Sequence, residues 1–266
     1  MKNLNEYINE SLLEGEDALM NDLDTKLIIK DFLDKNYKVT GGDFKLVKKS
    51  NNKYVVNSTG NVILINLDVT NLTNEYFEFG TVDGYFNCAR ATKLVSLKGS
   101  PMRVEDDFIC SYCKNLKTLE GAPEFVGYKF MCNSCAEMIS LKGAPKEIGG
   151  DFYCNFNLSL KSLEGCPEKI EGDFCCDDCR SLKSLEGAPK EVWGNFKCAG
   201  CNLTTLKGSP KCVDGDFNCE NNKKLKTAIG APKEVGGDFK CGGCGAGLTY
   251  QEIENVSYVD GSIFTL

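Results

Sequence analysis

The segment VEDDFICSYCKNLKTLEGAPEF, residues 104–125, is one complete copy of a pattern that occurs eight times in the chain. Successive phenylalanines of this pattern are separated by a constant 22-residue interval, except for a single 21-residue interval. They are Phe86, Phe108, Phe130, Phe152, Phe174, Phe196, Phe217 and Phe239. The eight units occupy about residues 82–248 of the chain. Repeats of this length indicate an architecture in which one small unit stacks on the next.

Each unit has the same apolar positions around its phenylalanine. A valine or isoleucine stands four residues before it and a cysteine two residues after it, as Val104 and Cys110 do around Phe108. A Leu-x-x-Leu pair follows in most units, and Gly-x-Pro closes each of the first seven. The alternation Phe-x-Cys has the period of a β-strand whose Phe and Cys side chains face the core. The glycines and prolines mark turns between strands.

The length of the unit predicts how the core forms. A 22-residue unit cannot bury its own apolar face, whereas stacked units cover one another. No segment within a repeat has the length and periodicity of a substantial α-helix. The sequence therefore predicts a mainly β protein, a parallel β-solenoid of about eight 22-residue coils that each contribute one strand. At the usual spacing of strands, this rod would be about 38 Å long.

The repeat resembles that of the leucine-rich-repeat family. Phe-x-Cys-x-x-Asn/Cys-x-Leu, as in Phe196, Cys198, Cys201 and Leu203, stands where that family has Leu-x-Leu-x-x-Asn/Cys-x-Leu. Most units depart from the family pattern by one extra residue before the leucine. The Cys-x-x-Leu-x-x-Leu segment followed by proline also looks like the BspA-type subfamily. The resemblance covers the eight repeats and implies a leucine-rich-repeat-like parallel β-solenoid.

Sixteen cysteines suggest metal or redox chemistry, which the repeat itself argues against. Five Cys-x-x-Cys pairs occur in phase with the repeat, and their second cysteine is replaced by Ala91, Asn157 and Asn222 in other units. A zinc site does not tolerate such replacements, whereas a buried column does, because a free cysteine packs as a small apolar residue. We therefore expect core thiols, with no metal and no cofactor. Adjacent coils would also bring cysteines within reach of disulfides. A thiol-based metal-binding protein is the alternative. The five pairs are Cys110 and Cys113, Cys132 and Cys135, Cys176 and Cys179, Cys198 and Cys201, and Cys241 and Cys244.

The segments that flank the repeats predict caps for the two ends of the solenoid. Residues 15–81 are expected to form a helical and β N-terminal cap, with strands near residues 54–56 and 62–67 that act as irregular early coils. Residues 249–266 predict a C-terminal cap, in which Thr249 and Glu252 form a capping box and Val256 to Phe264 a closing strand. Two amphipathic helices are expected at the N-terminus, with apolar stripes formed by Leu4, Ile8 and Leu12 and by Leu19, Leu23, Leu27, Ile28 and Phe32.

Composition and charge narrow the classes of function. The net charge of −7 repels phosphates, so we expect no nucleic-acid partner. The chain contains no histidine, which removes the commonest general base. No phosphate loop, dinucleotide fingerprint or nucleophile elbow occurs, and no acid–base pair stands out, so we expect a protein that is not an enzyme. The sequence contains no long apolar segment and no secretory signal, so we expect that the protein has no membrane partner and is not secreted through a signal peptide.

Residues 1–14 resemble the capsid-targeting peptides of T-even-type tailed bacteriophages. That resemblance implies an N-terminal helix that directs a protein into the prohead and is then cut after a (Leu/Ile)-x-Glu triplet. Glu10 and Glu14 end two such triplets, and Gly15 follows the second. The Cys-rich repeats also look like those of large phage genomes. We expect a phage virion or internal head protein, found in the host cytoplasm or the virion. The alternative is a bacterial or phage cytosolic repeat protein that inhibits a host factor by binding it.

Outward-facing positions of the repeat predict a surface that binds another protein. The residue between Phe and Cys is Ile109, Met131, Tyr153 and Cys175 in four consecutive units, which would form one exposed apolar row. A flanking segment that covers the row is the alternative. Trp193, the only tryptophan, is a second candidate anchor for a partner, or fills a gap near the shorter unit. The column of mostly Asp and Asn before each phenylalanine either caps turns or binds calcium.

Overall fold

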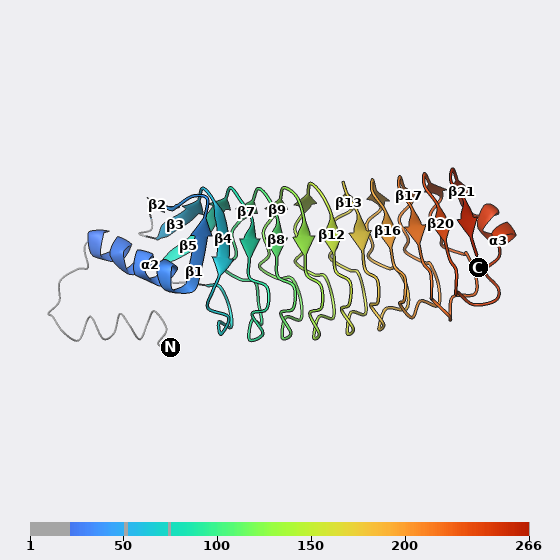
Figure 1. Ribbon diagram of the computed structural model, residues 1–266, viewed down its shortest axis with the longest axis horizontal. Helices are drawn as coiled ribbons and strands as arrows, with labels where there is room; N and C mark the ends of the chain where they lie inside the picture. The colour runs from blue at the N-terminus through green and yellow to red at the C-terminus, as the bar shows by residue number, and fades with distance from the viewer. Residues whose placement is uncertain (1–21, 51–52, 74–75, 266) are drawn as a thin grey trace.

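The computed structural model describes residues 22–50, 53–73 and 76–265, and Figure 1 shows them as one long rod. The chain is a mainly β, parallel β-solenoid, which confirms the predicted fold class. The first expected helix, with Leu4, Ile8 and Leu12, lies outside the described residues. So do Leu19 and the triplet residues Glu10, Glu14 and Gly15.

Each repeat contributes two short strands rather than the single strand expected. The Phe-x dipeptides supply eight strands of an eleven-stranded sheet, and the Val or Ile positions of the repeats lie in two further sheets of six and five strands. The eleven-stranded sheet contains β1 (Tyr37–Thr40), β4 (Asn61–Leu64), β6 (Phe86–Asn87), β8 (Phe108–Ile109), β10 (Phe130–Met131), β12 (Phe152–Tyr153), β14 (Phe174–Cys175), β16 (Phe196–Lys197), β18 (Phe217–Asn218), β20 (Phe239–Lys240) and β22 (Ile263–Phe264). The six-stranded sheet contains β11 (Glu147–Ile148), β9 (Phe125–Val126), β7 (Arg103–Val104), β5 (Phe77–Val82), β3 (Tyr54–Ser58) and β2 (Phe44–Lys48). The five-stranded sheet contains β13 (Lys169–Ile170), β15 (Glu191–Val192), β17 (Cys212–Val213), β19 (Glu234–Val235) and β21 (Tyr258–Val259).

The rod is longer than eight coils. Of the eleven strands in the large sheet, only β1 pairs in the antiparallel sense, which leaves 11 − 1 = 10 parallel coils. One additional coil, built from β3 and β4, precedes the repeats, so the expectation of irregular early coils is confirmed. The other follows them and is built from β21 and β22.

The core is a set of columns that run along the rod. All eight repeat phenylalanines are fully buried, and the centroids of neighbouring rings are 5.0–5.5 Å apart. Four of the seven neighbouring pairs are stacked and three are tilted. The Val/Ile column, the first cysteine column and the Leu-x-x-Leu columns are buried around them. Parallel pairing in exact register, as between Phe130 and Phe152, places like residues on one another and produces these columns.

The glycine of Gly-x-Pro is required by close approach as well as by conformation. Gly121 has a φ of +91°, which favours glycine. A Cβ atom built at this position would overlap the backbone of Lys98 in the previous coil. The tight spacing of the coils at this corner therefore depends on the missing side chain.

The N-terminal cap contains helix α2 (Asp22–Asn36) and two antiparallel strands, because β1 pairs with β4 and β2 with β3. The predicted face of this helix was wrong in part. Leu23 and Leu27 are 64% and 57% exposed, whereas Ile29 and Leu33 are buried. Leucine spacing alone could not show which side of the helix meets the first coil. Phe32 packs against β5, with its ring centroid 5.8 Å from that of Phe77.

The C-terminal cap contains helix α3 (Tyr250–Glu254), which begins at the predicted N-cap. The Thr249 hydroxyl accepts the backbone N–H of Glu252 at 3.3 Å, and Ile253 is buried against the end of the core. The single strand expected from Val256 to Phe264 is instead two strands, β21 and β22, which lie in different sheets. The turn between them contains Gly261, at the same place in the coil as the other inter-strand turns.

Candidate functional site

The predicted apolar row lies on the large sheet. Strand pairing places Ile109 beside Met131, Met131 beside Tyr153, and Tyr153 beside Cys175. The first three side chains are half-buried, and Figure 1 shows no helix lying across the strands that carry them. Cys175 is in register but only 7% exposed, so the expectation that it extends the exposed row is wrong. Its thiol lies 3.4 Å from an Asp177 carboxylate oxygen, which holds the side chain against the sheet.

Trp193 lies elsewhere on the rod. It follows β15 of the five-stranded sheet and is 48% exposed, so it does not join the apolar row. The Lys169 ammonium lies 3.6 Å from the centroid of its ring, a cation–π contact between neighbouring coils. The two predicted contact regions are therefore separate surfaces.

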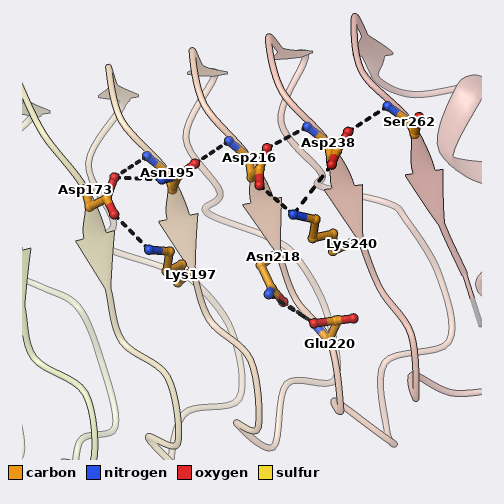
Figure 2. A network of polar contacts seen from close by, with 9 residues as sticks. All are labelled: Asp173, Asn195, Lys197, Asp216, Asn218, Glu220, Asp238, Lys240 and Ser262. Atoms are coloured by element: carbon orange, nitrogen blue, oxygen red, sulfur yellow. Dashed lines mark hydrogen bonds and ion pairs between the residues drawn. The ribbon is translucent and has the colours of Figure 1, made fainter.

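The column of Asp and Asn residues before the phenylalanines forms a hydrogen-bonded ladder, which Figure 2 shows at the C-terminal half of the rod. The Asp173 carboxylate accepts the N–H of Asn195 at 2.8 Å, and the Asn195 side-chain oxygen accepts the N–H of Asp216 at 2.8 Å. Asp216 and Asp238 continue the ladder to the backbone of the next coil in each case, at 2.9 Å. The column thus accepts hydrogen bonds from backbone N–H groups in the turns, which agrees with the turn-capping interpretation of the sequence.

The second carboxylate oxygens of this ladder bind lysines. Lys197 lies 2.8 Å from Asp173, and Lys240 lies 2.6 Å from Asp216 (Figure 2). The hydrogen bond from Lys240 lowers the pKa of Asp216 below its usual value. Within the described ranges, no group of three or more Cys, Asp or Glu side chains is arranged to hold a metal ion.

We expect Asp216→Ala to be more destabilising than Asp216→Asn. Asparagine keeps the oxygen that accepts the Asp238 N–H, as Asn195 already does for Asp216. Alanine leaves that N–H without its acceptor, and we expect a loss of about 1–2 kcal/mol in the free energy of unfolding. Urea unfolding followed by circular dichroism measures both. Equal losses for the two variants would show that the lysine contact, and not the ladder, matters here.

The two cysteine columns have different roles. The first, which includes Cys132 and Cys154, is fully buried, and burial raises the pKa of both thiols well above the usual value. The second column donates hydrogen bonds to the previous coil, because the Cys179 thiol lies 3.3 Å from the Cys154 carbonyl oxygen. All 16 cysteines are free thiols.

Asparagine side chains in the second column also donate hydrogen bonds to backbone carbonyls. The Asn157 amide donates to the carbonyls of Cys132 and Cys154, and the Asn222 amide donates to those of Cys198 and Cys219. The sequence interpretation treated this column as apolar packing and missed its hydrogen bonds. The exchange of cysteine for asparagine was the signal, because both side chains can donate to a carbonyl.

The residue after the second leucine of most repeats is a lysine or a glutamate, and two pairs from neighbouring coils form ion pairs. Lys142 lies 3.1 Å from Glu120, and Lys207 lies 2.7 Å from Glu186. These side chains are exposed, so each pair contributes little stability and mainly favours the correct register.

The chain matches no protein-family model, no curated protein and no solved structure. In the described part of the chain, none of the helices is long and apolar enough to cross a membrane.

Proposed function

We propose that this protein is a non-enzymatic scaffold that binds another protein through the apolar row Ile109, Met131 and Tyr153. The observation that carries the proposal is the register of β8, β10 and β12, which aligns these three side chains on a sheet face that no helix crosses in Figure 1. A contiguous apolar strip on an exposed face is typical of an interaction site. Parallel pairing fixes the strip in space before any partner arrives.

Polar contacts hold the aromatic member of the row in place. The Tyr153 hydroxyl donates to the Asp151 carboxylate at 3.0 Å, and Lys129 reaches the same carboxylate at 3.1 Å. The Lys129 ammonium also lies 5.8 Å from the centroid of the Tyr153 ring. A side chain that is already ordered loses little conformational freedom on binding, which favours affinity.

The biological setting that we propose is a phage virion or an internal head compartment. It is supported by the resemblance of residues 1–14 to capsid-targeting peptides and by the Cys-rich repeat, both of which are sequence observations. The rod contributes a rigid body on which such a protein could present a contact surface.

A photo-crosslinking amino acid at position 131, in the middle of the row, tests the binding surface. We expect a single covalent product in cells that naturally make the protein, and we expect Ile109→Asp to remove it by placing a charge in the same row. The matched control carries the crosslinker at Glu171, which is exposed and lies outside both the row and the turns that follow the large-sheet strands. Identical products from both positions, or none from position 131, would contradict the proposal.

The proposed phage setting is tested by the position at which the mature protein begins. Protein from purified particles is expected to begin at Gly15, or at Ser11 if the first triplet is cut. A chain that starts at Gly15 should keep the melting temperature of the full chain, because the proposal makes residues 1–14 a targeting peptide and not part of the rod. Absence from particles, or aggregation of the shortened chain, would count against the phage setting and leave the protein-binding row untouched.

A further inference from the structure

One long edge of the rod concentrates positive charge although the chain as a whole is acidic. We define the turn edge as the residues four to nine positions after each repeat phenylalanine. These residues form the loops that follow the strands of the large sheet, along the lower edge of the rod in Figure 1. Their charged members are Arg90, Lys93, Lys114, Lys117, Lys161, Arg180, Lys183, Lys223, Lys224 and Lys226 against Glu137 and Asp178, ten basic and two acidic, in a chain of net charge −7.

Most of these basic side chains are free to meet a ligand. Lys114, Lys117, Lys161 and Lys183 are exposed and form no ion pair with any residue that the structure describes. Lysines on the other surfaces are commonly paired, as Lys190 is with Glu168 and Lys240 with Asp216. Salt limits the field of a surface charge to about 8 Å under physiological conditions. A ligand that approaches the turn edge therefore meets its positive charge, and not the negative sum over the whole chain.

Two exposed aromatic residues interrupt the basic residues on the same edge. Tyr112 and Phe156 are 52% and 48% exposed, and both have left-handed backbone conformations, with φ of 64° and 59°. The same repeat position holds Gly200, Asn221 and Gly243, which adopt this conformation at lower cost. All eight repeats have a positive φ at this position, so the turn sets the backbone conformation and the aromatic side chains are not needed for it. The Tyr112 ring lies 5.7 Å from the guanidinium of Arg90, another basic residue of the turn edge.

We propose that the turn edge binds single-stranded nucleic acid. Its basic side chains would contact successive phosphates, and Tyr112 and Phe156 would stack on unpaired bases, the combination that sequence-independent single-strand binding uses. The coils are spaced at about 4.8 Å, so the two rings are roughly 10 Å apart along a line that a single strand can follow. This surface is distinct from the apolar row, so the proposal does not depend on the proposed protein partner. It also replaces the expectation of no nucleic-acid partner, which rested on net charge alone.

The first test measures how affinity depends on salt. The probe is a fluorescein-labelled oligo(dT) of about 20 nucleotides, titrated by anisotropy between about 50 and 200 mM salt. Each phosphate contact contributes about 0.7 to the slope of log K against log salt for a single strand. We expect the triple variant Lys117→Gln, Lys161→Gln and Lys183→Gln to reduce the slope by about 2. The control triple, Lys146→Gln, Lys190→Gln and Lys211→Gln, removes the same charge from exposed positions outside the turn edge and should keep the wild-type slope.

The second test separates stacking from charge. Tyr112→Asn and Phe156→Asn place the residue found at position 221 in the same backbone conformation, so the melting temperature should not fall. We expect each variant to weaken binding of oligo(dT) about tenfold, with no change in the salt slope. A duplex of the same length should bind less tightly than the single strand, because its bases are already stacked.

Four results would overturn the proposal. One is no binding of oligo(dT) at low salt, and another is an equal loss of slope in the two lysine triples. The third is that poly-glutamate displaces the labelled oligonucleotide as well as unlabelled oligo(dT) does, when both competitors are compared at equal concentrations of charge. That result would make the edge a site for acidic proteins. The fourth is salt-dependent self-association without oligonucleotide that the turn-edge triple abolishes, which would make a second copy of this chain the ligand.

Discussion

Phe152→Ala is expected to lower the free energy of unfolding by about 3–5 kcal/mol, because it creates a cavity at the centre of a continuous column. Phe152 is fully buried, and its ring centroid lies 5.3 Å from that of Phe130 and 5.5 Å from that of Phe174. The coils above and below are held by their own hydrogen bonds, so they cannot easily close the cavity. Urea unfolding monitored by far-ultraviolet circular dichroism measures the loss.

Trp193→Ala is the matched control for this change. Tryptophan is the larger residue, but Trp193 is 48% exposed and its ring meets the ammonium of Lys169. Loss of an exposed cation–π contact costs about 0.5–1 kcal/mol. If both variants lost the same stability, the division of side chains into a buried Phe column and an exposed Trp would be incorrect.

Cys176→Asn is expected to destabilise the protein by about 2–4 kcal/mol, because an amide would enter a fully apolar column without enough partners. Cys176 is completely buried, and all eight repeats keep cysteine at this position. The amide is also larger than the thiol, and a close-packed core accommodates extra volume poorly.

Cys179→Asn, three residues away, should change the stability by no more than about 1 kcal/mol. Asparagine at Asn157 and Asn222 already donates to the carbonyls that the thiols of this column contact. The contrast between the two variants, measured by the same unfolding experiment, tests the assignment of one column to packing and the other to hydrogen bonding. A severe loss in Cys179→Asn, accompanied by unfolding with a chelator, would favour metal ligation by the thiols.

The sequence predicts the solenoid well because its strongest signal is a set of apolar residues that recur at one interval. Parallel stacking in register turns each recurring residue into a column along the rod. Phe152 and Cys154 repeat at one spacing, so their burial follows from stacking alone. The second strand of each coil, such as Glu147–Ile148, was missed because it contains one buried apolar residue, whereas Phe152-x-Cys154 shows the alternation of two. The buried face of α2 was missed in part because one helix offers several leucines and isoleucines, and only the neighbouring coil selects Ile29 and Leu33.

Surface properties were harder to predict than the core. The position of Cys175 in the row follows from the repeat, but its burial depends on a contact with Asp177 that no spacing reveals. The second cysteine column looked apolar because its carbonyl partners belong to the backbone of another coil, as for Cys179 and Cys154. The net charge of the chain does not report where the charges lie. The basic turn edge is found only when the residues are sorted by their position in the coil.

The exact register of the stacked strands bears on how such a protein can evolve. Phe130 pairs with Phe152, and Phe152 pairs with Phe174, so loss of one whole unit from the gene would bring Phe130 opposite Phe174 in an equivalent pair. The 21-residue interval between Phe196 and Phe217 shows that even an incomplete unit keeps this pairing. Coils contact mainly their neighbours, so duplication or deletion of units changes the length of the rod without disturbing its two caps. Recombination within the gene can thus adjust the span that the protein offers to a ligand one coil at a time.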